Sequence, residues 1–145
     1  MKKFLVTLIC GAMILSSSLC FAAVDDSKIA LGSIYPGMSA NDLTNAFGQP
    51  NYRDGDDWIY QNFKVEIENG IVEKVSTTSD TLVAAGGVRV GQSATALNST
   101  YGKADKVDYD DGGVEYEYYG NGSAKKIEFK VMNGVITKIT CKIRD

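Results

Sequence analysis

Residues 37–50 read Gly-Met-Ser-Ala-Asn-Asp-Leu-Thr-Asn-Ala-Phe-Gly-Gln-Pro, and residues 91–102 repeat the pattern as Gly-Gln-Ser-Ala-Thr-Ala-Leu-Asn-Ser-Thr-Tyr-Gly. These two copies are 54 residues apart. A second matching pair is Asn-Gly-Ile-Val at residues 69–72 and Asn-Gly-Val-Ile at residues 133–136, which are 64 residues apart. The second copy therefore contains ten additional residues. The sequence predicts an internal duplication.

Each copy begins with the pattern of a short helix. In the first, Ser39 is a preferred residue at a helix N-cap, and Leu43 and Phe47 are four apart and share one face. Gly48 is then a good left-handed stop, and Pro50 prevents continuation. The second copy has alanine three residues after its serine where the first has aspartate, so its helix start is predicted to be weaker.

Strand patterns follow each helix. Residues 63–68 and 127–131 alternate between apolar and mostly charged side chains, which is typical of half-buried strands. After each run comes an Asn-Gly pair, a strong signal for a two-residue hairpin turn, and then a returning apolar strand. Residues 58–60 and 114–118 predict one further strand in each copy.

These patterns predict an α+β fold made of two tandem repeats, each a short helix followed by a three-stranded antiparallel meander. Neither meander buries its apolar face alone, so we expect one sheet of about six strands with both helices on one face. The predicted divisions are a signal peptide (1–22), an N-terminal segment (23–31), repeat 1 (32–77), a connection (78–84) and repeat 2 (85–145).

The first residues are typical of a secretory signal peptide. A basic start at Lys2 and Lys3 precedes the apolar run 4–15 and a segment of mostly small residues, with cleavage expected after Ala22. A lipoprotein would need a small residue before Cys20, where leucine stands. We therefore expect a secreted or periplasmic protein, with no stable membrane insertion after cleavage, rather than a lipid-anchored one.

Charge and cysteine content limit the partners. Cleavage removes two of the 15 basic residues and none of the 18 acidic ones, so the formal net charge changes from −3 to −5. This balance argues against nucleic acid or an anionic membrane as the partner. Two of the three cysteines leave with the signal peptide, so Cys141 has no partner for an internal disulfide.

Alternation along the predicted strands also defines an outward face rich in Glu and Lys. These charges are expected to form attractive cross-strand pairs. One interpretation is a solvated face kept soluble by charge, and another is a partner-binding face with apolar contacts among the charges. The candidate partner-binding residues are Ile59, Val72, Tyr119, Ile136, Glu115, Glu117 and Lys138.

The pattern Gly-Met-Ser-x-x-x-Leu-x-x-x-Phe-Gly-x-Pro at residues 37–50, followed by a meander with an Asn-Gly turn, resembles a known structural unit. It is similar to the helix-plus-meander unit of SmpA/OmlA-type outer-membrane assembly lipoproteins and of the β-lactamase-inhibitor-protein family. Two such units in a row resemble the tandem arrangement of the inhibitor family. The resemblance covers residues 32–143 and implies a non-catalytic module that binds an envelope enzyme or scaffolds a membrane complex.

Two acidic clusters lie at equivalent positions between each helix and the next predicted strand. Carboxylates on a flexible loop are ligands that calcium accepts, but Asp and Gly are also common turn residues, and neither cluster continues as a calcium-binding loop. Turn formation is the interpretation we favour over metal binding. The candidate metal ligands are Asp54, Asp56, Asp57, Asp108, Asp110 and Asp111.

Catalytic patterns are lacking in this sequence. It has no histidine, which excludes Ser-His-Asp and Cys-His catalysis, and we expect no enzyme activity and no cofactor. Cys141 lies beside Ile139 and Ile143 on a predicted strand and is expected to be a buried, inert thiol. The leading hypothesis is a secreted or periplasmic protein–protein interaction module that binds an unknown envelope or extracellular protein. The alternative is a binder of calcium, a glycan or another small ligand.

Overall fold

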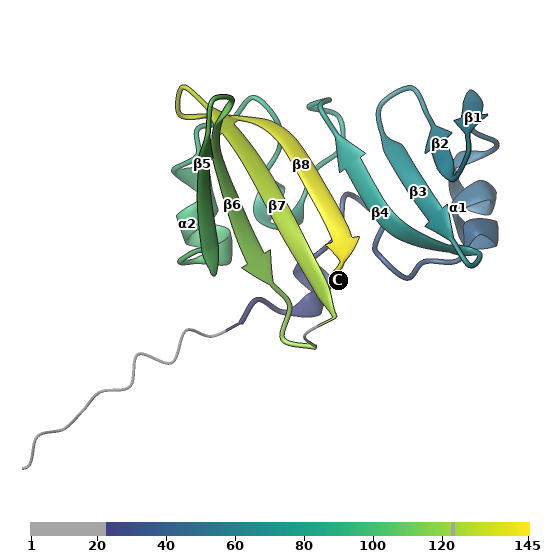
Figure 1. Ribbon diagram of the computed structural model, residues 1–145, viewed down its shortest axis with the longest axis horizontal. Helices are drawn as coiled ribbons and strands as arrows, with labels where there is room; N and C mark the ends of the chain where they lie inside the picture. The colour runs from purple at the N-terminus through teal and green to yellow at the C-terminus, as the bar shows by residue number, and fades with distance from the viewer. Residues whose placement is uncertain (1–22, 123) are drawn as a thin grey trace, which may run out of the picture.

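The computed structural model describes residues 23–122 and 124–145, so the predicted signal peptide lies outside the described residues. Within them, eight strands form a single antiparallel sheet in the order β1-β2-β3-β4-β8-β7-β6-β5 (Figure 1). The first part of the chain supplies η1 (Asp26–Lys28), α1 (Ala40–Phe47), β1 (Tyr52–Asp54), β2 (Asp57–Ile59), β3 (Lys64–Glu68) and β4 (Ile71–Thr77). The second part supplies η2 (Ala85–Gly87), α2 (Ala96–Tyr101), β5 (Lys106–Asp110), β6 (Gly113–Tyr119), β7 (Lys125–Met132) and β8 (Val135–Ile143).

The α+β class and the single sheet are as predicted, but the number of strands is not. Four strands follow each helix instead of three, because the acidic clusters expected in loops form hairpins. Residues 54–57 connect β1 to β2, and residues 110–113 connect β5 to β6. Both added strands, β1 and β5, are exposed along their whole length. β1 is too short to show a pattern, whereas Val107 and Tyr109 of β5 do alternate with charged residues, so a signal for this strand was present.

The Asn-Gly turns have equivalent geometry. Asn69 and Asn133 both have φ of 50°, as a type I′ turn requires, and each turn connects two adjacent antiparallel strands. The segment before each helix is bonded to the returning strand in the same way, because the N–H of Gly37 donates to Val72 O and the N–H of Gly91 to Ile136 O, both at 2.8 Å. These bonds fix where each helix starts relative to the sheet.

Two residues expected on the outward face, Val72 and Ile136, are fully buried in the core. The reason is a β-bulge in each returning strand. In β4, Val72 pairs with Ile67 and Lys74 with Glu66, which leaves Glu73 as an extra residue. Thr137 is the extra residue at the matching place in β8. One extra residue reverses the alternation, so Val72 before the bulge and Val75 after it both face the core, as do Ile136 and Ile139 in β8.

Both helices cover the same face of the sheet, at opposite ends of it (Figure 1). Leu43 of α1 and Leu97 of α2 are buried in one core with the inward side chains of the strands. The ring of Phe47 in α1 lies 5.3 Å from that of Phe63, and the ring of Tyr101 in α2 lies 5.1 Å from that of Phe129. The described residues contain no helix with the length and apolar character to cross a bilayer.

The N-terminal segment is part of this core. Ile29 and Leu31 are fully buried, and the hydroxyl of Tyr101 donates a hydrogen bond to Lys28 O at 3.1 Å. Cys141 in β8 is fully buried, as expected, and its burial raises the pKa of the thiol. A buried thiol with a raised pKa is a poor nucleophile.

Candidate binding surface

The sheet face opposite the helices is the surface that we call the open face. Its side chains alternate along each strand with those that face the core. It carries Asp57, Ile59, Lys64, Glu66, Lys74, Lys106, Asp108, Glu115, Glu117, Tyr119, Lys126, Glu128, Lys130, Lys138 and Lys142.

A network of ion pairs occupies the centre of the open face. Glu117 is only 4% exposed although it is charged, and Lys126 Nζ lies 3.0 Å from its carboxylate, with Lys106 Nζ at 3.5 Å. Lys126 Nζ also lies 2.7 Å from Glu128, which in turn pairs with Lys142 at 3.2 Å. The central charges therefore shield one another from water, and each depends on its neighbours.

These contacts shift the acid–base properties of the central pair. Burial acts to raise the pKa of Glu117, but the hydrogen bond and charge of Lys126 and the charge of Lys106 outweigh it, and the pKa is lowered. Burial likewise acts against the charged form of Lys126, but its bonds to Glu128 and Glu117 outweigh it and raise the pKa of the ammonium group. Both groups stay charged at neutral pH.

Some charges that face each other directly across strands attract, as expected, such as Glu66 with Lys74 and Glu117 with Lys106. Others are of like sign. Lys142 lies opposite both Lys74 and Lys126, and Glu117 lies opposite Glu128. Like charges in direct opposition destabilise a sheet. Here they are compensated by contacts to other strands and rows, such as that between Lys126 and Glu117.

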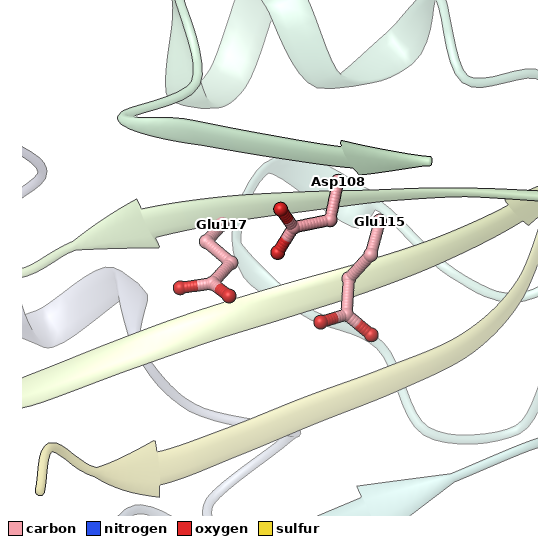
Figure 2. A group of neighbouring side chains, drawn as sticks. All are labelled: Asp108, Glu115 and Glu117. Carbon is pink, nitrogen blue, oxygen red and sulfur yellow. The ribbon is translucent and has the colours of Figure 1, made fainter. Parts of the chain in front are cut away.

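The network continues towards the β5 edge as a group of three carboxylates on β5 and β6, which Figure 2 shows together on one side of the sheet. Oxygens of Asp108, Glu115 and Glu117 lie within 4.8 Å of one another. Lys106 contacts two of them, with distances of 2.6 Å to Asp108 and 3.5 Å to Glu117. Glu115 forms no ion pair with a described residue. Burial, followed by repulsion from Glu128 and Glu117, raises the pKa of Glu115.

The six acids predicted as metal ligands do not come together. Those of the first cluster line a hollow of about 250 Å³ next to β1 and β2, whereas those of the second lie on β5 and its turn, at the opposite edge of the sheet. Asp57 is paired with Lys64 at 2.8 Å. Asp110 accepts a hydrogen bond from Gly112 N at 2.7 Å, which is turn chemistry. The hollow contains Asp54, Asp56 and Asp57, and the other edge contains Asp108, Asp110 and Asp111.

Five of the seven predicted partner-binding residues lie on the open face: Ile59, Glu115, Glu117, Tyr119 and Lys138. Ile59 and Lys138 come from different halves and line one groove of about 450 Å³ at the place where the halves meet. Sequence reasoning missed this groove. The polar run of residues 76–79, which lines it, was the available signal.

No protein-family model matches this sequence, and no curated protein matches it. Solved structures do share its fold. The chain is similar to a DUF4309 family protein, YjgB, from Bacillus subtilis, with 14% identity over 73% of this chain and 78% of that one and a TM-score of 0.52. It is also similar to an extracellular protein containing an SCP domain from Bacillus anthracis, with 6% identity and a TM-score of 0.54.

A third similar structure is a cysteine-rich secretory protein, SAV1118, from Staphylococcus aureus, with 12% identity and a TM-score of 0.51. The matches cover 74% and 84% of this chain but only 43% of the Bacillus anthracis protein and 50% of SAV1118. The fold therefore corresponds to about half of each of those larger proteins. At these identities the similarity concerns the fold alone.

Proposed function

We propose that this chain is an exported, non-catalytic module that binds another protein through the open face of its sheet. The observation that carries the proposal is the arrangement of charge at the centre of that face, where Lys74, Lys142 and Lys126 lie in one row and Glu128 and Glu117 in the next. Local rules of stability are most often broken at functional sites. Rows of charge also give a protein partner a pattern to complement, which improves specificity and association rate.

The module is proposed to have arisen by duplication. In support, the bonds from Gly37 and Gly91 to the returning strands have the same length, and the two bulges occupy matching positions. The strand order also reads from either edge as four strands of one half followed by the other half in reverse. A duplicated unit of this kind accords with the resemblance to the inhibitor and assembly-lipoprotein group, whose members bind envelope proteins.

Export is proposed from the N-terminal sequence. A basic start, an apolar run and small residues before Ala23 form the pattern of a cleaved signal. Two of the similar structures are described as an extracellular and a secretory protein, which is in keeping with this location. The proposed partner is thus a protein of the cell envelope or the exterior.

The test compares two variants with the same change in charge. Lys138→Glu changes the open face at the groove, and Arg89→Glu changes an exposed residue on the connecting segment before α2. Residues 23–145 are crosslinked to proteins of the source's own envelope. We expect Lys138→Glu to abolish this capture and Arg89→Glu to retain it. Capture by the parent should decrease as the salt concentration is raised. Equal capture by the two variants would show that the open face is not the binding site.

The alternative from the sequence, binding of calcium or another small ligand, has one supporting observation, which is the proximity of Asp108, Glu115 and Glu117. A calcium ion would have to compete with Lys106 for two of these carboxylates. If millimolar calcium raises the melting temperature of the parent and not of Glu115→Gln, this alternative gains support over the protein-binding proposal. An unchanged melting temperature removes it.

A further inference from the structure

The edge strand β5 presents apolar side chains to solvent. Its five residues are all exposed, Tyr109 to 80% and Val107 to 38%. Val107 and Tyr109 lie opposite Tyr116 and Val114 in the register, so they are on the helix side of the sheet. A hollow of about 390 Å³ between α2 and β5–β6 extends this apolar area.

The opposite edge is built differently. β1 has only three residues, and the guanidinium of Arg53 lies 3.9 Å from the ring centroid of Trp58, so a charge covers the aromatic residue on the neighbouring strand. Short edge strands and charged side chains are the usual ways in which proteins prevent pairing at a sheet edge. β1 has both, whereas β5 is longer and presents Val107 where β1 presents Arg53.

We propose that two copies of this chain associate by antiparallel pairing of β5 with β5 around a two-fold axis at Asp108. In this register Lys106 lies opposite Asp110 of the second copy, and Val107 lies opposite Tyr109 of the second copy. Each pair occurs twice by symmetry. The two sheets become one continuous sheet, with the helices of both copies on the same side.

The sequence Lys-Val-Asp-Tyr-Asp favours a second copy of the chain as the partner of the β5 edge. It is complementary to itself in reverse, because its basic end meets its acidic end and its two apolar residues meet each other. Shifting the axis to Tyr109 would place Asp108 opposite Asp110 and lose the apolar pair. Within β5, the only like-charged pair of the proposed register is Asp108 with its own copy, and Lys106 neutralises it from 2.6 Å within each chain. Asp110 also has an exposed contact to Lys130 at 3.5 Å, long enough to be shared.

The first test uses cysteine crosslinking at the proposed axis. Facing residues of paired antiparallel strands have Cα atoms about 4.5–5.5 Å apart, which suits a disulfide. We expect Asp108→Cys in residues 23–145 to form a disulfide-linked dimer under mild oxidation at least about tenfold faster than Asp54→Cys, its counterpart on β1. The native Cys141 is fully buried and does not contribute. Equal crosslinking of the two variants would overturn the proposal.

The second test measures mass in solution by light scattering over a range of concentrations. The parent is expected to reach twice the mass of one chain. Tyr109→Lys should raise the dimer dissociation constant by roughly tenfold or more, because the change occurs twice across the axis. The matched control is Tyr52→Lys, which alters an exposed tyrosine on β1 and should leave the constant unchanged. A monomer at all concentrations, or growth beyond the dimer, would contradict this interface. Both outcomes are independent of whether the open face binds a partner.

Discussion

In the first half of the molecule Ser39 Oγ accepts a hydrogen bond from Asp42 N at 3.0 Å and caps α1, whereas no side chain caps the start of α2 in the second half. The Asn-Gly turns, in contrast, are the same in both halves. The φ of Gly70 is 77° and that of Gly134 is 75°, so the two hairpins keep the same backbone geometry. The two halves are therefore alike where backbone geometry allows few solutions, and they differ where tertiary packing supports the element in another way.

The greatest loss of stability is predicted for substitutions next to the two bulges, and it shows whether the bulges are equivalent. Ile136→Asp buries a carboxylate without a partner and should lower the free energy of unfolding by about 4 kcal/mol or more. Val72→Asp should do the same in the first half. Denaturant unfolding followed by circular dichroism measures both. The control is Val135→Asp, since that neighbour is 39% exposed. Tolerance of only one core substitution would show that the halves are packed differently.

The next prediction concerns the pH dependence of stability. β6 contains two glutamates, whereas the corresponding strand of the first half, β2, contains none. Because its pKa is lowered, Glu117 stabilises the folded state at neutral pH, and this stability is lost as pH falls through and below its ordinary value of 4.5. Glu117→Gln should therefore lower the free energy of unfolding at pH 7 by about 1–3 kcal/mol.

Glu115 should behave in the opposite way. Its pKa is raised, so its charged form destabilises the folded protein at neutral pH, and acidification towards 4.5 relieves this. Glu115→Gln should raise the free energy of unfolding at pH 7 by up to about 1 kcal/mol. Its advantage should disappear at pH 4, where the parent also carries a neutral side chain. Urea unfolding at the two pH values checks this, and a stabilisation that persists at pH 4 would contradict it.

A smaller effect separates the two helix starts. Ser39→Ala removes the cap of α1 and should lower stability by about 1 kcal/mol. Ser93→Ala removes only exposed turn contacts to Thr95, from its N–H at 3.3 Å and with its hydroxyl at 3.0 Å, so it should lower stability by only about 0.3 kcal/mol. The melting temperatures of the two variants measure the difference. Equal losses would mean that Ser93 supports α2 in another way.

The smallest effect is expected at the β1 edge. Arg53→Ala uncovers Trp58 and should lower stability by about 0.5–1 kcal/mol, the usual strength of an exposed cation–π contact. Trp58 is the single tryptophan of the chain, so its fluorescence reports this change directly, and we expect a shift to longer wavelength. Lys106→Ala, at the other edge, is the control and should leave the emission unchanged.

Much of the fold follows from local signals in the sequence. The Asn-Gly turns and the alternation in residues 63–68 and 127–131 predict the inner hairpins, because these patterns have few alternative structures. The two β-bulges were not predicted from the sequence, although the spacing of apolar residues indicates one. Apolar residues at 72 and 75 are three apart, a spacing that an unbroken strand cannot place on one face.

The outer strands and the site were harder to predict. β1 has only three residues, and β5 shows its two apolar residues among three charged ones next to a turn, so neither segment is long or apolar enough to be separated from a loop by its sequence alone. The open-face residues Glu115 and Lys138 follow from alternation alone. The groove between the halves and the near-complete burial of Glu117 depend on contacts between β4, β6, β7 and β8, which the order of residues does not reveal.

β8 is the last of the eight strands along the chain, yet it lies in the middle of the sheet against β4. During synthesis, β4 can therefore pair with β3 on one side, but its other edge stays open until β8 has been made. The export proposed above would require the chain to remain unfolded until it has crossed the membrane, and a seam completed by the last strand favours that delay. A chain truncated before β8 would lose the pairing that connects the two halves of the sheet, and not merely an edge strand.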